Sequence, residues 1–387
     1  MLNHWLKMKQ AEVKSEPCKV LQIGNYPPPV CGWSIQTKLL VEEIRRRGNV
    51  CEVLNLSENR RQKSADYVDV QNILDYLYKV IMFAVRGYRF QVHVNGQSKP
   101  GYVLALIAAL AGRCAGSPVA LSWRGGLDQK YFPRSQASWT RWAYQFLFRL
   151  AGRISCNSVP VKRAIEQYGL SPQRVAAIPA FSAQHLKFQR VPLAREIEAF
   201  MANHHPLFFC YVSFRAEYRL SVLREAMQNF RLHNARAGFI WCGFPSKEIP
   251  EVSGFVGNWP PHERQSLLLL GNLCHDEFLT LLSRSVAYIR TPVCDGVSAS
   301  VLESLALGTP VVASENGYRP AGVVTYREAD AADLCAKLAE VTLKHRQVKA
   351  QLRLPLSEDN ISRTADWLLR PSDTLQQGTG ETLRHAV

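Results

Sequence analysis

The chain has 387 residues, which is long for a single hydrophobic core and predicts two domains of similar size. Hydrophobic residues make up 47% and charged residues 20%, a globular composition that excludes an intrinsically disordered chain. Lys and Arg outnumber Asp and Glu by 47 to 32, and the excess lies in one half: residues 1–187 hold 26 basic against 11 acidic residues, whereas residues 188–387 hold 21 of each. The basic half is either a solvated surface or one that meets an anion, such as nucleic acid, membrane head groups or a phosphorylated substrate.

Ten cysteines are spread along the chain without a C-x-x-C pair, so neither a zinc site nor a redox dithiol is expected. Several, such as Cys210 and Cys242, lie in apolar runs and read as buried side chains in a reducing compartment. The N-terminal segment has no apolar core of a secretory signal. The longest apolar run, Tyr102–Gly112, is too short to span a bilayer. We therefore expect a cytoplasmic protein whose membrane contact, if any, is peripheral.

Strands and helices alternate along the first half. A strand at Lys19–Gly24, a loop rich in Pro and Gly, a helix at Ile35–Gly48 and a strand at Val50–Leu56 form a β-α-β unit, which indicates a parallel sheet. The patterns further predict strands at Phe90–Gly96, Pro118–Gly126, 153–158 and Val175–Phe181, and helices at Tyr102–Gly112, Trp139–Arg153 and 159–169.

The alternation restarts at Leu207 after a polar stretch. The predicted strands are Leu207–Phe214, Ala237–Gly243, Ser266–Gly271, Val286–Pro292 and Thr309–Ser314, and the predicted helices are 220–234, 275–285, Ser298–Gly308, 330–350 with Asp330 as its N-cap, and Asn360–Arg370. We therefore predict an N-terminal extension (1–18), a first domain (19–187), a linker (188–206), a second domain (207–370) whose last helix can pack back on the first, and a disordered tail (371–387).

One segment, Arg290–Ser314, carries the clearest chemistry. A strand is followed by a loop with Asp295, and small residues then open a helix, so that backbone N–H groups can approach a phosphate closely. Asp295 and Glu303 stand eight residues apart across the loop and the first turns of that helix. The two carboxylates can bracket a ligand lying over the helix N-terminus.

This segment resembles the signature of the large family of retaining GT-B nucleotide-sugar glycosyltransferases. That signature is an acidic residue, seven further residues and Glu, followed by a Gly-x-Pro-Val-Val-Ala run. Here it reads Asp295 to Glu303 and then ALGTPVVA, with Asp where Glu is commoner. The resemblance implies that Asp295 contacts the donor's sugar and that Glu303 binds the ribose hydroxyls. The pyrophosphate would lie on the backbone of Gly296, Val297, Ser298, Ala299 and Ser300.

The resemblance also places an Arg and a Lys after the first strand of the second domain, where they bind the donor's phosphates. In this chain SFRAEYRL offers Arg215 and Arg219, at a spacing one residue shorter than the common pattern. The alternative is that Arg215 and Arg219 are surface arginines that bind no phosphate. No D-x-D motif of the metal-dependent glycosyltransferases is evident, so neither a metal nor another cofactor is expected beyond the nucleotide sugar.

The first half resembles the same family more weakly. Gly32 matches one glycine of a Gly-Gly loop expected to touch the donor, and Trp33, next to it, is placed on the acceptor side. The second loop of this half carries His93, Asn95 and Lys99, also on the acceptor side, although His93 is equally well explained as a structural histidine. Where many members carry a catalytic His-Gly, this chain has Arg124 followed by two glycines. Arg124, at a strand's carboxyl end, would stabilise a leaving phosphate instead.

The predicted helix at Trp139–Arg153 puts Trp139, Trp142 and Phe146 on one face, with Arg141 and Arg149 elsewhere. Aromatic and basic residues in this arrangement suit a helix at a membrane interface. They suit a helix that packs on a core equally well.

Together these features predict an α/β protein of two Rossmann-like domains facing a cleft. The leading hypothesis is a retaining hexosyltransferase that moves a sugar from a nucleotide sugar to a lipid-linked or other glycan acceptor in surface polysaccharide assembly, at an anionic inner membrane face. The alternatives are a nucleic-acid-binding protein, for which no recognition motif is present, and another GT-B enzyme such as a nucleotide-sugar epimerase.

Overall fold

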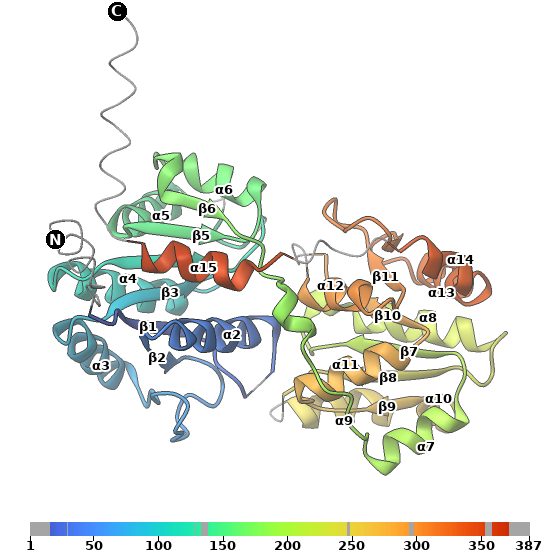
Figure 1. The fold of residues 1–387 in the computed structure, drawn as a ribbon. Helices are drawn as coiled ribbons and strands as arrows, with labels where there is room; N and C mark the ends of the chain where they lie inside the picture. Colours follow the sequence, from blue (N-terminus) through green and yellow to red (C-terminus); the bar gives the residue numbers. More distant parts are fainter. Residues whose placement is uncertain are drawn as a thin grey trace, which may run out of the picture.

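The computed structural model describes residues 16–28, 30–127, 129–132, 138–245, 248–293, 298–352 and 358–370. They form two α/β lobes, each built on a six-stranded parallel sheet with helices on both faces (Figure 1). The predicted fold class is thereby confirmed. The predicted tail 371–387 and most of the predicted N-terminal extension lie outside the described residues.

The first sheet has the strand order β2-β1-β3-β4-β5-β6. The chain adds β2 on one side of β1 and all later strands on its other side, so the order of strands reverses between β1 and β3. Its strands are β1 (Lys19–Gly24), β2 (Val50–Asn55), β3 (Arg89–Val94), β4 (Val119–Trp123), β5 (Arg153–Cys156) and β6 (Val175–Ala177). Its helices are α2 (Gly32–Arg46), α3 (Ile73–Val85), α4 (Lys99–Cys114), α5 (Ser138–Leu150), α6 (Val159–Glu166) and the 3-10 turns η1 (Pro172–Arg174) and η2 (Ala183–Leu186).

The second sheet has the order β12-β11-β10-β7-β8-β9, the doubly wound order of dinucleotide-binding domains, with its reversal between β7 and β10. Its strands are β7 (Leu207–Tyr211), β8 (Gly238–Cys242), β9 (Leu267–Leu269), β10 (Ala287–Arg290), β11 (Val311–Ser314) and β12 (Val324–Tyr326). Its helices are α7 (Arg195–Asn203), η3 (Ala216–Tyr218), α8 (Leu220–Arg231), α9 (Ile249–Gly257), α10 (Pro261–Arg264), α11 (His275–Arg284), α12 (Ala299–Ala306), α13 (Ala331–Leu343) and α14 (His345–Ala350), followed by α15 (Asn360–Leu369). Ligands of such sheets bind outside the carboxyl ends of the strands at the reversal.

Several elements differ from the sequence-based expectation. Helices α3, α9 and α10 and strand β12 are absent from the prediction, and α7 lies within residues predicted as linker. The predicted helix 330–350 is two helices that meet at Lys344, although its N-cap is correct, since the side chain of Asp330 accepts a hydrogen bond from the N–H of Asp333 at 2.8 Å. The other predicted helices and strands form, with ends shifted by a few residues.

Helix α15 follows the second domain in sequence but packs on the first (Figure 1). Its residues Ile361, Ala365 and Leu368 share a buried cluster with Leu40 and Ile44 of α2. The opposite face of the same sheet is covered by α3, α4, α5 and α6. The chain therefore crosses between the domains twice, once through η2 and once into α15.

Glu43 on α2 joins the two helices electrostatically. It is 8% exposed, and its Oε1 accepts hydrogen bonds from Arg47 at 2.7 Å and from Ser362 of α15 at 3.1 Å. Hydrogen bonds from Arg46, and then from Arg47 and Ser362, lower the pKa of Glu43 to about 2. A carboxylate whose pKa is lowered on folding stabilises the protein above its unfolded-state pKa and loses this contribution as the pH falls through the folded-state value.

We therefore expect Glu43→Gln to lower the free energy of unfolding at pH 7 by up to about 3 kcal/mol. The difference from the wild type shrinks as the pH falls from about 5 to 2, because the wild-type carboxyl then takes up a proton. Urea unfolding across that range measures both. Glu42→Gln on the same helix is the control, since the Glu42 side chain is 55% exposed and lies 3.9 Å from Lys38. An equal loss in both variants would contradict the assigned role of Glu43.

No helix among the described residues is long and apolar enough to cross a membrane.

Candidate functional site in the cleft between the domains

In the first domain, three neighbouring strands end at the same edge of the sheet with Gly24, His93 and Arg124 at or just beyond their carboxyl ends. The imidazole of His93 lies directly over the end of β1, where a Cβ on Gly24 would collide with the ring. A glycine at position 24 therefore lets the His93 side chain lie over the end of β1. This is the reversal point of the first sheet.

Arg124 and His93 lie side by side at this edge. Arg124 Nη2 is 3.5 Å from His93 Nε2, and Arg124 is only 4% exposed. Burial lowers the pKa of Arg124 to about 10, which leaves it charged at neutral pH. Burial, and then the charge of Arg124, lower the pKa of His93 well below its usual value, so the imidazole is neutral. Arg124 Nε has no hydrogen-bond partner, and no acidic residue in the described part of the chain pairs with this cation.

A buried cation without a counter-ion is costly in free energy. Such a cation is retained where an anion completes the site. Arg124 reaches from the end of β4 to His93 at the reversal point of the sheet, where such a ligand would bind. The predicted location of Arg124 at a strand's carboxyl end is correct.

The N-terminus of α2 meets the N-terminus of α12 across the cleft. A Cβ placed on Gly32 would lie 3.2 Å from the Cβ of Ala299. Cys31, which precedes α2, lies close enough to Arg124 in one domain and to Tyr211 in the other to influence the ionisation of both. Two positive helix ends and a buried guanidinium therefore converge on one region, an arrangement suited to phosphate groups.

Hydroxyl groups fix the start of α12. Ser298 is the N-cap residue of α12, but its side chain accepts no hydrogen bond from the helix. Its Oγ lies 2.9 Å from Ser300 Oγ. Ser300 Oγ in turn lies 2.8 Å from the hydroxyl of the buried Tyr288. This chain of hydroxyls runs from the second sheet to the helix N-terminus. It holds two of the residues predicted to line the donor's pyrophosphate, Ser298 and Ser300, next to Ala299.

Glu303 lies one turn into α12 and is 5% exposed. Its Oε1 is 2.9 Å from Nε2 of His275, the first residue of α11. His185 of η2 lies nearby, 1% exposed, with no hydrogen-bond partner for Nε2. Burial lowers the pKa of His185, while the charge of Glu303 raises it and the charges of His275 and Arg124 lower it. His185 thus lies close to Glu303 of the second domain and to Arg124 of the first.

Arg290 ends β10 at the reversal point of the second sheet and is 7% exposed. Its guanidinium carbon lies 5.5 Å from the ring centroid of Tyr211 and 5.4 Å from that of Tyr218. Sequence reasoning missed Arg290, His275 and His185 as site residues. For Arg290 a signal was available, since it directly precedes the loop that holds Asp295.

The two arginines predicted to bind the donor's phosphates are both exposed. Arg215 follows β7 and is exposed. Arg219 is exposed as well, has a left-handed backbone conformation (φ 49°), and its Nη2 lies 3.0 Å from Oε1 of Glu328. Their contact with a donor stays a prediction.

Asp295, Gly296 and Val297 lie outside the described residues. The segment leading to them is braced by Arg319, whose guanidinium donates to the carbonyl oxygens of Pro292 at 2.7 Å and Ser314 at 2.8 Å. The first turn of α12 and the residues that follow β10 are thus both held in place.

A cavity of about 490 Å³ opens at the carboxyl edge of the first sheet. Three of the residues predicted for the acceptor side, Trp33, His93 and Asn95, line it, whereas Lys99 lies outside it, 5.6 Å from the ring of Trp139. The remaining lining includes the basic residues Arg60 and Arg61 and an apolar wall of Leu56, Val70, Ile73, Tyr76 and Leu104. A ligand with an anionic and an apolar part would fit this cavity.

No family model matches the sequence, and no curated protein matches it. Solved structures do. HepE of Anabaena in complex with UDP-glucose superimposes with a TM-score of 0.61 at 13% identity, covering 94% of this chain and 98% of that one. A glycosyltransferase from Rickettsia africae gives a TM-score of 0.61 at 12% identity, covering 95% and 100%. The chain has the GT-B fold.

A UDP-N-acetylglucosamine 2-epimerase also matches, with a TM-score of 0.61 at 13% identity, covering 94% of this chain and 98% of that one. At such identities the likeness establishes the fold alone. The GT-B fold nevertheless explains why the polar residues of both domains gather at the facing carboxyl edges of two parallel sheets.

In the described part of the chain, no cluster of three or more His, Cys, Asp or Glu side chains is arranged to hold a metal ion.

Proposed function

We propose that the protein is a retaining glycosyltransferase that moves a sugar from a nucleotide sugar to a lipid-linked glycan acceptor in surface polysaccharide assembly. The observation that carries the proposal is the pairing, across one cleft, of the unpaired buried cation Arg124 with the buried acid Glu303, both close to His185. An acid suited to a ribose diol and a cation suited to a diphosphate are the two charges that a nucleotide sugar needs.

In the proposed reaction Glu303 accepts hydrogen bonds from the ribose hydroxyls, and the diphosphate lies on the N-terminus of α12 opposite Arg124 and Gly32. The bond between the anomeric carbon and the phosphate oxygen breaks, and its electron pair leaves with the nucleoside diphosphate. Arg124 and the helix end stabilise that developing charge. The acceptor hydroxyl attacks from the same face and gives its proton to the leaving phosphate, so configuration is retained. We propose that these groups supply the required positive charge without a metal ion.

The donor is tested by thermal unfolding against sugar conjugates of uridine, guanosine and adenosine diphosphate. A ligand that binds only the native state raises the melting temperature by mass action. At a ligand concentration a hundred times the dissociation constant the stabilisation is about 2.7 kcal/mol, which is a rise of several degrees. We expect one base to stand out. No shift with any nucleotide sugar would refute the proposed donor.

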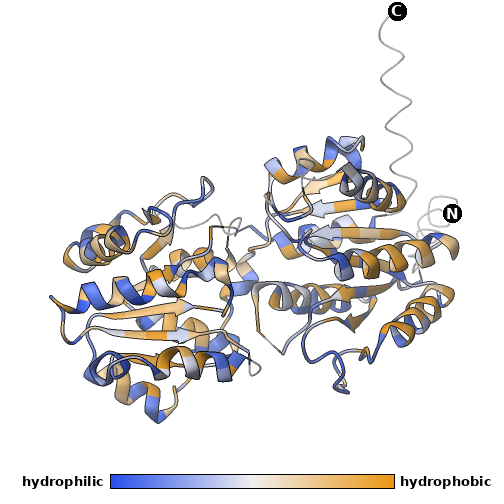
Figure 2. Ribbon diagram, turned by 180° about the vertical axis from the view of Figure 1, so that it is seen from behind, coloured by the Kyte–Doolittle hydropathy of each residue, from blue (hydrophilic) through white to orange (hydrophobic). Residues whose placement is uncertain are grey.

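The acceptor side of the proposal rests on the outer surface of the first domain. Helices α3, α4 and α5 expose large hydrophobic side chains there, and α3, at the lower right in Figure 2, is predominantly hydrophobic. The exposed residues are Ile73, Leu74, Leu77, Tyr78, Ile81 and Val85 on α3, Val103 and Leu110 on α4, and Trp139, Trp142 and Phe146 on α5. We name this surface the α3–α5 face. The core interpretation of the Trp139–Arg153 helix is thus wrong for its tryptophans, while Leu147 of that helix is buried.

Cations lie beside these aromatic rings, as Lys99 does at Trp139 and Arg141 at Trp142, 5.7 Å from its ring centroid. Apolar and aromatic side chains flanked by cations are typical of proteins that lie on anionic membranes. The acceptor-side cavity is lined by Ile73, which is also part of the α3–α5 face. A lipid-linked acceptor would therefore reach the cavity directly from a membrane on which this face rests.

The triple variant Leu74→Ser, Tyr78→Ser, Trp142→Ser is expected to bind vesicles containing anionic phospholipid at least tenfold more weakly, because each substitution removes apolar area from the interface. The three side chains are 74%, 67% and 67% exposed, so folding is little affected. Co-sedimentation with vesicles measures the change. The control triple, Leu232→Ser, Tyr318→Ser, Leu343→Ser, alters exposed residues of the second domain. If both triples bound as the wild type does, the α3–α5 face would not be a membrane surface.

A further inference from the structure

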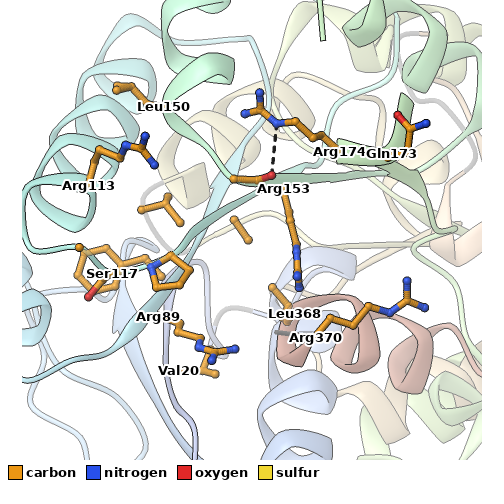
Figure 3. A pocket seen from close by; sticks show the side chains of 16 residues that line it. Val20, Arg89, Arg113, Ser117, Leu150, Arg153, Gln173, Arg174, Leu368 and Arg370 are labelled. Carbon is orange, nitrogen blue, oxygen red and sulfur yellow. Dashed lines mark hydrogen bonds between the residues drawn. The ribbon is translucent and has the colours of Figure 1, made fainter. Parts of the chain in front are cut away.

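A second cavity, of about 580 Å³, opens at the amino ends of β3, β4 and β5, at the edge of the first sheet opposite Arg124. Five arginines line it from separate segments (Figure 3): Arg89, Arg113, Arg153, Arg174 and Arg370. None of the described residues that line it is acidic. We call it the five-arginine pocket. Strand β4, which runs from this pocket to the cleft, separates the two by roughly 15 Å.

Backbone carbonyls at the ends of two helices position three of these guanidinium groups. Arg153 Nη1 donates to the carbonyl of Trp367 at 2.7 Å and Arg89 Nη1 to that of Leu369 at 3.4 Å, both in the last turn of α15. Arg174 Nε donates to the carbonyl of Gly152, just after α5, at 3.4 Å (Figure 3). Cations at helix C-termini are stabilised by the helix dipole. Arg174 Nη2 also donates to the carbonyl oxygens of Phe148, Arg149 and Ala151. A guanidinium has five N–H donors, so Arg89 and Arg174 keep donors for a ligand beside these bonds.

In the described part of the chain, four of the five arginines lie without an acidic partner. In the described ranges no ion pair joins Arg89, Arg113, Arg174 or Arg370 to a carboxylate. Burial, and then the charges of Arg89 and Arg370, lower the pKa of Arg153. Burial and the charge of Arg113 lower the pKa of Arg174. The guanidinium groups therefore repel one another across the cavity, and an anion bound among them would relieve that repulsion.

We propose that the five-arginine pocket binds a phosphate-bearing anion, at a site separate from the cleft. Several guanidinium groups converging from different directions can hold a phosphate or diphosphate bidentately, which a solvated basic surface does not do. The phosphate can belong to a free phosphorylated metabolite or to a lipid head group, and the site does not depend on the reaction proposed for the cleft.

The anion would tighten the end of α15. Two of the five arginines already bond to that helix, and Leu368 and Arg370 line the cavity. Helix α15 packs on α2, whose N-terminus at Gly32 meets α12 across the cleft. Amide hydrogen exchange of residues 360–370 is therefore a local readout of the pocket.

The experiment compares exchange in the full-length protein alone, with inorganic pyrophosphate, and with phosphatidylcholine vesicles containing phosphatidic acid. We expect exchange in residues 360–370 to slow by about fivefold or more with at least one of the two probes. Protection by pyrophosphate identifies a free phosphate compound as sufficient, and protection by the vesicles alone identifies a lipid head group. If neither probe slows exchange in residues 360–370, the proposal is wrong.

The double variant Arg113→Gln, Arg370→Gln should lose this protection. Both residues are exposed, and within the described ranges neither side chain forms a hydrogen bond or an ion pair, although Arg370 contacts the ring of Trp367. Arg236→Gln with Arg346→Gln removes the same charge from exposed positions of the second domain and should keep it. Arg124→Met, which removes the cation of the cleft, should keep it as well. Equal loss in the pocket pair and the distant pair would mean that net charge, and not the pocket, causes the effect.

Discussion

Arg124→Met is expected to lower the rate of sugar transfer by about 100- to 1,000-fold, the usual loss when one fixed donor to a developing anion is removed. The same variant should be at least as stable as the wild type. Methionine fills a similar volume, and it removes a cation that is 4% exposed and has no carboxylate partner among the described residues. Steady-state kinetics and urea unfolding of the one variant measure both effects.

The combination of lost activity with retained stability separates a functional from a structural arginine. Arg124→Lys keeps the charge but not the fork of donors, and we expect it to recover only part of the rate. A variant Arg124→Met that unfolds more easily and still transfers sugar at the wild-type rate would show that Arg124 serves the fold.

Glu303→Gln is expected to weaken binding of the nucleotide sugar by about 10- to 100-fold, because a hydrogen bond to a charged group contributes roughly 1.5–3 kcal/mol. Glutamine has nearly the shape of glutamate. In the wild type, Nε2 of His275 lies 2.9 Å from Oε1 of Glu303, and the carbonyl oxygen of a glutamine there can still accept a hydrogen bond from His275. The loss should appear in the dissociation constant, measured by calorimetry, with little change in stability.

His275→Gln is the matched control for Glu303. The amide it introduces can donate to the carboxylate, so the acid stays in place, and we expect the dissociation constant to change by less than about threefold. If His275→Gln weakened donor binding as much as Glu303→Gln, the ion pair as a whole, and not the acid, would be what the donor requires.

The sequence predicted the two-domain fold because strand and helix patterns alternate regularly, and it located Arg124, Glu303 and the start of α12 at strand and helix ends. Helix α3 was missed for a physical reason: its outward side carries Leu74, Tyr78 and Val85, so no polar face marks it as a surface helix. The pattern that hid the helix is the same exposed apolar surface that we assign to membrane contact.

Other features depend on tertiary structure and leave no local pattern. His185 is a single histidine in a polar stretch, and only the fold brings it close to Glu303 and Arg124. The arginines of the second pocket span positions 89 to 370, and they meet because α15 returns to the first domain. The basic excess of the first half, evident from composition, is therefore spread over several sites, among them Arg124 at the carboxyl edge of the first sheet and the five-arginine pocket at its amino edge.

The most direct test of the central claim is an incubation of the purified protein with the nucleotide sugar that raises its melting temperature, with and without lipid-linked glycan acceptors from a membrane extract. We expect nucleoside diphosphate to be released only when the acceptor is present, and the sugar to appear in the lipid fraction with its anomeric configuration retained. An isomerised nucleotide sugar formed without any acceptor would contradict the claim and identify an epimerase instead.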